Sequence, residues 1–460
     1  MTPNPHNTNK GHKGNNMNSQ ASTADSSQFA PNDTASASTA IIDKGLLIPF
    51  ILITACFALW GAANNMTDLL VPAFQKVLSM SQFESSFIQS AFYGAYFCMA
   101  LPAAILIQKY SYKKGVLIGL GIYALGAALC FPASQAMSFY FFLFAFYVFA
   151  AGCAILETVA APYILSMGPE ATATQRINLA QAFNPIGVLL GVYLGKEVIL
   201  KGLNSASESE RGAMAAEELA KIQGMELSNV VTAYIVVGLV SLLLATLIFF
   251  KRFPDGKSGD KFGSLGESFK RLRKNSNWKF AVVAQFFYVG CQVGVWTYAV
   301  KYIMVNLTGE NTEAEAAQFV FYGLCVYTSF RFLCTFLMTY ISPSRLLSLM
   351  ATLAICFVST AIFVGGEIGT YALLASFSCM SLMFPTIYGL GLTGVGEDRK
   401  LGGSFIIMAI LGGAVIVPFQ GWIIDQTDVN TSYLIPLTCF AIVLVYSLFA
   451  HKKEAEVGIN

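Results

Sequence analysis

Long apolar runs separated by short polar segments dominate the chain after about residue 45. A bilayer core needs roughly 20 apolar residues in each helical crossing, and largely uncharged runs of about this length recur along the sequence. We expect spanning helices at 46–72, 83–107, 115–132, 138–167, 176–200, 229–250, 278–304, 316–341, 345–364, 369–391, 402–424 and 430–450. This pattern predicts an all-α membrane protein with twelve transmembrane helices.

Charged residues divide these helices into two sets of six. A basic connector follows the sixth helix, and the basic residues of several other loops and of the C-terminal tail fall on the same side of the predicted bundle. Because cytoplasmic loops carry an excess of Lys and Arg, we expect both termini in the cytoplasm. The predicted organisation is a disordered tail (1–44), a six-helix bundle (45–251), the connector (252–277), a second six-helix bundle (278–451) and a short tail (452–460).

Composition agrees with this organisation and argues against several function classes. The chain is 55% hydrophobic and 12% charged, with a net charge of +2 that is spread over short loops, so nucleic-acid binding is not indicated. Its ten cysteines lie in apolar segments without CxxC spacing, and its three histidines lie in the tails. We therefore expect no metal site, no cofactor and no enzymatic activity. The loop at 201–228 is acidic and could include a short amphipathic helix, to which no function is assigned.

Asp68 and Glu157 are the candidate carboxyl groups inside the predicted membrane helices, where an ionisable side chain is costly and usually functional. Asp68 ends a polar stretch of the first helix and shares a helical face with Asn65, three residues earlier. Glu157 lies in the fourth helix without a Lys or Arg within two turns. Burial penalises the charged form of a carboxyl, so either group is a candidate proton carrier. Arg331, the nearest intramembrane cation, lies in the other half and is interpreted as a helix cap or latch rather than a substrate ligand.

Amides and aromatic residues recur on two helix faces. Gln181 and Asn184 lie three apart in the fifth helix, and the seventh helix carries Tyr288, Gln292 and Trp296 near one face. Amides both donate and accept hydrogen bonds, and rings stack on apolar surfaces, so such a set suits a small polyhydroxy ligand. Interhelical hydrogen bonding and aromatic packing are the structural alternatives at these positions.

Several longer strings make a resemblance specific. They are Asn64-Asn-Met-Thr-Asp-Leu-Leu-Val-Pro72, Gln89-Ser-Ala-Phe-Tyr-Gly-Ala-Tyr-Phe97, Leu156-Glu-Thr-Val-Ala-Ala-Pro162, Arg176-Ile-Asn-Leu-Ala-Gln-Ala-Phe-Asn184, Ala284-Gln-Phe-Phe-Tyr-Val-Gly-Cys-Gln292, Phe384-Pro-Thr-Ile-Tyr388 and Gly403-Ser-Phe-Ile-Ile-Met408. With them the chain resembles the L-fucose and proton symporter family of the major facilitator superfamily, which also holds glucose/galactose and N-acetylglucosamine carriers. The resemblance covers nearly the whole chain after the tail.

The resemblance implies alternating access between two halves, with Asp68 taking and releasing the proton and Glu157 linking sugar to protonation. The substrate-binding set then comprises Asn65, Glu157, Gln181, Asn184, Tyr288, Gln292, Trp296, Phe384 and Tyr388. The chain departs from the fucose carriers at Thr67, Ala161, Pro185 and Phe384.

These departures leave the sugar open between L-fucose, another hexose and an amino sugar, coupled to protons or to sodium. The expected partners are a monosaccharide, protons and the lipid bilayer of a bacterial inner membrane, with a monomer as the functional unit. A transporter-like sugar sensor is the alternative from another class.

Overall fold

The computed structural model describes residues 41–43, 45–78, 82–194, 198, 204, 206, 208–253, 264–307 and 313–457. Within these ranges some side chains are not described, namely those of 64, 65, 67–76, 78, 82–86, 89, 90, 108, 208, 209, 313, 314 and 454–457. The expected tail thus falls almost wholly outside the described residues, as does the middle of the connector. All described helices belong to one compact unit that runs from Thr39 to Asn460.

Helices form nearly all of the described chain. The first half contains α1 (Leu47–Leu78), α2 (Gln82–Lys109), α3 (Tyr112–Gln135), α4 (Phe139–Leu165), α5 (Ala173–Gln181), α6 (Asn184–Leu194), α7 (Glu208–Ala213) and α8 (Ala216–Phe250). The connector contains α9 (Leu265–Lys274). The second half contains α10 (Ser276–Asn306), α11 (Glu313–Leu337), α12 (Pro343–Phe363), α13 (Gly366–Met380), α14 (Met383–Gly391), α15 (Arg399–Met408), α16 (Gly412–Gln426), α17 (Val429–Ser432) and α18 (Leu434–Val457).

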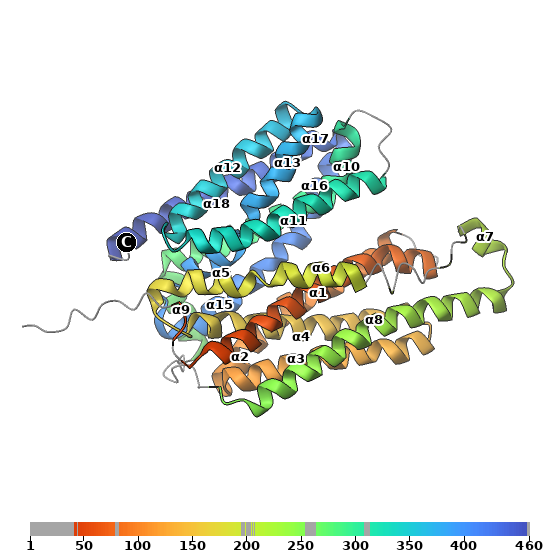
Figure 1. The fold of residues 1–460 in the computed structure, drawn as a ribbon, viewed down its shortest axis with the longest axis horizontal. Coiled ribbons are helices and arrows are strands. Elements are labelled where there is room, and N and C mark those ends of the chain that lie inside the picture. The colour runs from red at the N-terminus through yellow and green to blue at the C-terminus, as the bar shows by residue number, and fades with distance from the viewer. Residues whose placement is uncertain are drawn as a thin grey trace, which may run out of the picture. The chain divides into compact units, whose positions relative to one another are not determined.

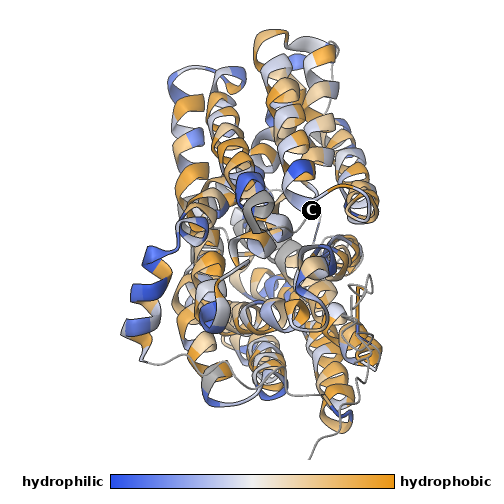
Figure 2. Ribbon diagram, turned by 90° about the vertical axis from the view of Figure 1, so that its left-hand side faces the viewer, coloured by the Kyte–Doolittle hydropathy of each residue, from blue (hydrophilic) through white to orange (hydrophobic). Residues whose placement is uncertain are grey.

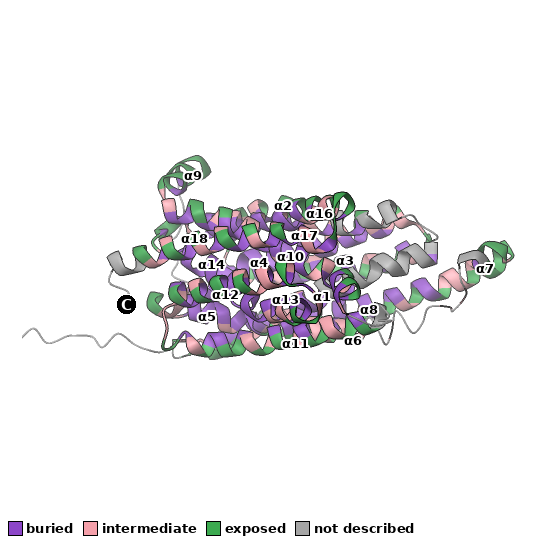
Figure 3. Ribbon diagram, turned by 90° about the horizontal axis from the view of Figure 1, so that it is seen from above, coloured by how far each residue is buried: buried purple, intermediate pink, exposed green. Residues whose placement is uncertain are grey.

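The two halves can be distinguished in Figure 1, where most of the red to light-green helices lie on one side and most of the teal to blue helices on the other, while α15 packs against α2 and α4 of the first half. Ten described helical segments are long and apolar enough to cross a membrane, and α1 and α2 add the shorter apolar stretches Leu47–Ala63 and Ala91–Ile107. Apolar residues cover the outward faces of these helices, as Figure 2 shows. The buried residues gather between the helices (Figure 3), and α7 and α9 stand out at opposite ends.

Local sequence explains where helices begin. Ser111, Ser138, Ser264 and Asn275 precede α3, α4, α9 and α10, and each side chain accepts a hydrogen bond from a backbone N–H in the first turn. These bonds satisfy donors that have no partner within the helix. The expected helix starts at 115, 138 and 278 agree with those of α3, α4 and α10 to within a few residues, whereas α9 lies in the connector, where no helix was expected.

Three expected helices are interrupted. The fifth divides into α5 and α6 at residues 182–183, the tenth into α13 and α14 at 381–382, and the eleventh into α15 and α16 through a 3-10 turn at Ala409–Leu411. Pro185 and Pro385 lie in the first turns of α6 and α14, where a missing N–H costs least. A Cβ atom at Gly412 would lie 1.9 Å from the Phe286 carbonyl oxygen of α10, so this position requires glycine.

Basic segments that are far apart in the sequence meet at one end of the bundle, which we call the α9 end. Arg271 of α9 forms an ion pair with Asp398, just before α15, at 2.6 Å. The ring of His451 in α18 lies 3.4 Å from the Arg345 guanidinium of α12. The expected grouping of basic loops on a single side agrees with these contacts.

Candidate functional site

A central cavity of about 410 Å³ lies between the two halves. Its volume falls in the lower part of the range of about 300–1,000 Å³ that is usual for small-molecule sites. The first half contributes residues of α1, α2, α5 and α6, and the second half contributes residues of α10, α11, α14 and the turn before α16. Apolar side chains such as Val188, Leu189, Val293 and Leu324 alternate with polar and aromatic ones along its wall.

Five predicted substrate residues line this cavity, namely Gln181, Asn184, Gln292, Trp296 and Phe384. The Asn184 amide donates to the Phe57 carbonyl at 3.1 Å, and the Gln292 amide donates to the Tyr327 hydroxyl at 3.2 Å. Within the described part of the chain, Nε2 of Gln181 and Nε1 of Trp296 have no hydrogen-bond partner. Buried donors of this kind require an acceptor from a ligand or from water.

Arg331 is part of the cavity wall and also joins the halves. Its guanidinium donates to Oε1 of Gln181 at 3.0 Å and to the Tyr327 hydroxyl at 2.6 Å, and the residue is 3% exposed. Gln181 belongs to the first half, so the contact crosses between the two bundles. The interpretation of Arg331 as a latch alone was therefore too narrow, because the same side chain faces the space where a ligand would lie.

Glu157 lies behind the cavity wall rather than in it. Its side chain is 2% exposed, and neither carboxyl oxygen has a hydrogen-bond partner among the described residues. Tyr96 and Tyr388 are close enough to interact with it electrostatically. Nε1 of Trp60, a cavity residue, donates to the Tyr96 hydroxyl. Tyr96 and Trp60 therefore connect the buried acid to the cavity.

Two predicted substrate residues of the second half lie outside the cavity lining. The Tyr288 hydroxyl donates to the Met380 carbonyl at 2.8 Å, so this ring is held in the packing between α10 and α13. Tyr388 is fully buried, with a hydroxyl that has no partner among the described residues. Of the three predicted residues near one face of α10, only the later two, Gln292 and Trp296, therefore line the cavity.

Asn65 and Asp68 lie in the second part of α1, but their side chains are outside the described residues. Trp60, one or two turns earlier in α1, lines the cavity. The role of Asp68 as proton carrier, and the face of α1 on which it lies, therefore stay sequence-based expectations.

Sequence reasoning missed several wall residues, chiefly Trp60, Tyr93, Tyr327 and Thr328. Three of them are aromatic side chains in apolar helices, where packing is the usual role. Nothing in their spacing distinguishes them from the many aromatic residues that face lipid. In the part of the chain with described side chains, no group of three His, Cys, Asp or Glu residues could hold a metal ion.

Polar contacts between the halves lie on the α9 side of the cavity. The Asn178 amide donates to the Thr386 hydroxyl at 3.1 Å, and the Gln175 amide donates to the Thr335 carbonyl at 3.3 Å. Further out, Arg399 forms an ion pair with Glu170 at 3.0 Å. Together these contacts join the halves at the α9 end.

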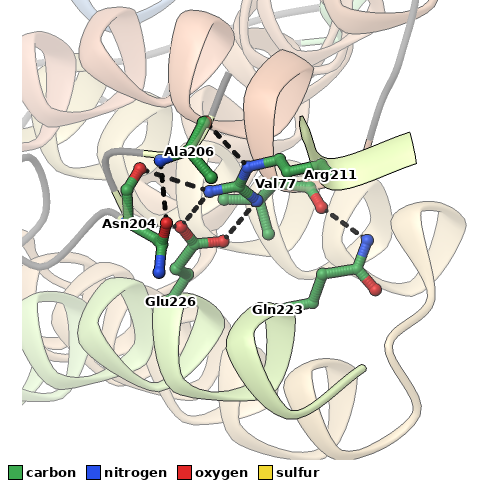
Figure 4. Close-up of polar contacts among 6 residues, drawn as sticks. All are labelled: Val77, Asn204, Ala206, Arg211, Gln223 and Glu226. Atoms are coloured by element: carbon green, nitrogen blue, oxygen red, sulfur yellow. Dashed lines mark hydrogen bonds and ion pairs between the residues drawn. The ribbon is translucent and has the colours of Figure 1, made fainter. Parts of the chain in front are cut away.

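The opposite end carries the acidic loop. Both terminal nitrogens of Arg211 in α7 donate hydrogen bonds to the Glu226 carboxylate of α8, and both side chains are 2% exposed (Figure 4). The Gln223 amide also donates to the Val77 carbonyl of α1 at 2.8 Å. A short helix is therefore present in this loop as α7, fixed to α8 by a buried ion pair, whereas residues 216–228, which were expected to belong to the loop, form the first part of α8.

Two apolar helical halves around a cavity, joined at one end by contacts between them, define a membrane transport protein. The model of the Major Facilitator Superfamily matches residues 51–400. The L-fucose-proton symporter of Escherichia coli is 37% identical over 90% of this chain and 95% of its own length, and that of Haemophilus influenzae is 39% identical over 90% and 98%. The chain belongs to the Major Facilitator Superfamily and, within it, to the family that contains these L-fucose-proton symporters.

Solved structures agree with this family. The crystal structure of the major facilitator transporter FucP in the outward conformation superimposes with a TM-score of 0.82, at 37% identity, over 88% of this chain and 99% of that one. A glucose/galactose transporter of Brucella abortus is 29% identical over 87% of this chain and 93% of its own length. The predicted all-helical major facilitator fold is confirmed.

Proposed function

We propose that this chain is a proton-coupled monosaccharide symporter and that its preferred substrate is L-fucose. The observation that carries the proposal is the central cavity, whose wall contains the amides of Gln181, Asn184 and Gln292 and the ring of Trp296. Amides suit sugar hydroxyls, and an aromatic face suits the apolar face of a sugar ring. The identity of 37–39% with two L-fucose-proton symporters supports this choice of substrate.

Proton coupling is assigned to Asp68 and Glu157. Glu157 lies behind the wall without a hydrogen bond or ion pair among the described residues, and Arg331 acts on it only through longer-range electrostatics, so its ionised form is costly to bury. A proton on this carboxyl removes that cost. Protonation from the outer side would favour sugar binding, the halves would rock, and loss of the proton to the cytoplasm would release the sugar.

The proposed orientation places the α9 end, both termini and the connector in the cytoplasm of a bacterial inner membrane, because the basic loops gather there. The contacts that join the halves at this end then close the cavity to the cytoplasm. The proposed boundaries are 45–251 and 278–451 for the bundles, flanked by 1–44, 252–277 and 452–460. The functional unit is proposed to be a monomer in the lipid bilayer.

Uptake by membrane vesicles tests the proposal. Vesicles that contain the protein should accumulate labelled L-fucose when the outside is acidic, and an uncoupler should abolish the accumulation. Glu157→Gln and Asp68→Asn keep the size of each side chain but remove the titratable group. Both should lose uphill accumulation while retaining counterflow of sugar. Uphill accumulation by Asp68→Asn would exclude Asp68 as the proton carrier.

A glucose or galactose carrier is the second candidate, supported by the Brucella abortus relative and by a putative glucose/galactose transporter of Helicobacter pylori at 32% identity. The same vesicles should be offered L-fucose, glucose, galactose and N-acetylglucosamine, with a proton gradient or a sodium gradient. Preference for another sugar would replace the L-fucose assignment. Sugar binding without counterflow would instead support the sugar-sensor alternative.

A further inference from the structure

Helix α9 in the connector is fixed to the second half by one buried side. Leu272 is 2% exposed, and the Phe269 ring packs on Phe405 of α15 with centroids 5.3 Å apart. The Arg271 guanidinium donates to both carboxylate oxygens of Asp398, at 2.6 and 2.8 Å. These contacts determine which side of the helix remains open.

The open side of α9 combines apolar and basic residues. Successive residues of a helix turn by about 100°, so Leu265 and Phe269 lie about 40° apart. They are 43% and 39% exposed. Arg273 lies about 40° further round the helix, followed by Lys270 and Lys274, and all three are exposed. We call these five residues the α9 outer face, an apolar strip bordered by three cations.

The α9 outer face lies at the level where the surface of α10 becomes apolar. The Phe405 ring contacts both Phe269 of α9 and Trp278 of α10, with centroids 5.3 and 5.6 Å away. Directly after Trp278, Lys279 is exposed and Phe280 is 50% exposed. Because α10 is long and apolar enough to cross the membrane, this change from basic to apolar marks the membrane surface.

Helix α9 stands beside the bundle and is not in line with α10. Asn275, which separates the two helices, has an extended backbone with a ψ angle of 107°, so the chain changes direction there. Figure 3 shows α9 beyond the side of the bundle at this end. Lipid surrounds the bundle at the level of its apolar helices, and α9 therefore lies against the edge of the bilayer.

We propose that the α9 outer face binds anionic phospholipids, with Leu265 and Phe269 at the acyl chains and the three cations at the headgroup phosphates. Helices that carry Lys and Arg beside Leu and Phe bind at this interface. A helix of 10 residues buries little apolar area, but α10 holds α9 next to the membrane, so little further affinity is needed. The proposal involves neither sugar nor proton and goes beyond the proposed function.

A fluorescent label on α9 reports contact with lipid. Gly266 is exposed, and a Cβ atom there meets nothing within 4 Å, so Gly266→Cys accepts a bimane label on the same side as Arg273. The exposed Cys98 and Cys356 and the half-buried Cys325 are replaced by alanine. The full-length protein is placed in phosphatidylcholine nanodiscs with increasing fractions of spin-labelled phosphatidylglycerol or spin-labelled phosphatidylcholine, which quench bimane on contact.

Spin-labelled phosphatidylglycerol should reach half-maximal quenching at a fraction at least about tenfold below that of spin-labelled phosphatidylcholine, because each Lys or Arg near an anionic surface contributes about fivefold in affinity. Lys270→Gln, Arg273→Gln and Lys274→Gln should each raise the phosphatidylglycerol fraction about fivefold. The triple variant should quench equally with both lipids. Leu265→Ser should weaken quenching by both lipids, because the apolar strip then enters the membrane less readily.

Lys114→Gln is the matched control. Lys114 is exposed at the same end, near the start of α3 in the first half, so this variant loses one positive charge while α9 is unchanged. It should quench like the native protein. An equal effect of Lys114→Gln and Arg273→Gln would overturn the proposal, as would native protein that does not distinguish the two lipids. Absence of quenching by either lipid would also overturn it and would favour a soluble acidic partner. The assay contains no sugar and no proton gradient, so a failure of the proposed symport leaves its result unchanged.

Discussion

The Tyr327 hydroxyl is a single atom on which two cavity side chains depend. It accepts hydrogen bonds from the Arg331 guanidinium at 2.6 Å and from the Gln292 amide at 3.2 Å. Tyr327→Phe removes that atom and preserves the ring that packs against Trp296 at 5.3 Å. The substitution should therefore change the orientation of the two donors without opening a void in the wall.

The size of the effect follows from the two bonds. A hydrogen bond from a charged donor contributes about 1.5–3 kcal/mol in a buried site, and a neutral one about 0.5–1.5 kcal/mol. Water can replace the hydroxyl because these residues border a cavity, so most of this energy is recovered. We expect the free energy of sugar binding to become less favourable by about 1 kcal/mol because the two donors are less well oriented. This change weakens sugar affinity about fivefold.

Equilibrium binding of L-fucose to purified protein is the assay. Tyr322→Phe is the control, since Tyr322 is 56% exposed on the same helix and does not line the cavity. Thermal stability should be nearly equal in the two variants. An unchanged dissociation constant for Tyr327→Phe would refute the idea that this hydroxyl orients the binding groups.

Three further predictions concern stability. Arg211→Met leaves the Glu226 carboxylate buried without its cation, which should cost about 3–5 kcal/mol and speed hydrogen exchange at the start of α8; native exchange rates would contradict this. Gly187→Ala places a Cβ atom 1.7 Å from a carbonyl oxygen of α1 and should lower the melting temperature, whereas Gly121→Ala meets nothing within 4 Å and should not. Hydrogen bonds from Thr431 hold the pKa of Asp428 below its usual range, so the stabilisation by Asp428 is present above the unfolded pKa and is lost as pH falls through the lower folded pKa. Asp428→Asn should therefore flatten the acid limb of a plot of melting temperature against pH, and an unchanged limb would show that Asp428 contributes nothing there.

The sequence predicted most of the membrane helices because lipid offers the backbone no hydrogen-bond partners. Each apolar crossing must therefore pair its own N–H and C=O groups, which a helix does. Pro385 and Gly412 indicate a break or a close contact in the tenth and eleventh expected helices, and both helices are interrupted near these residues, whereas the break before Pro185 was not predicted. These residues identify a position where a helix can break, but only the neighbouring helix determines whether it does. At Gly412, for example, the decisive fact is the approach of α10.

Part of the candidate site could be predicted from the sequence because polar groups are also costly inside the membrane. Gln181, Asn184 and Gln292 stand out because amides are costly in an apolar helix, and all three line the cavity. Tyr288 lies on the same face of α10 as Gln292, but its hydroxyl donates to a backbone carbonyl, a partner that no sequence spacing specifies. Arg331 was visible as a buried cation, yet its contact with Gln181 depends on how the two halves meet.

The distribution of tryptophan gives the cavity an optical signal of its own. The chain has four tryptophans, and two of them, Trp60 and Trp296, line the cavity from opposite halves. Trp278 is buried with its indole N–H bonded to the Gly402 carbonyl, and Trp422 is 57% exposed on the outer surface of α16. A sugar that enters the cavity would therefore alter the emission of half the fluorophores, and its binding could be followed in unmodified protein by intrinsic fluorescence.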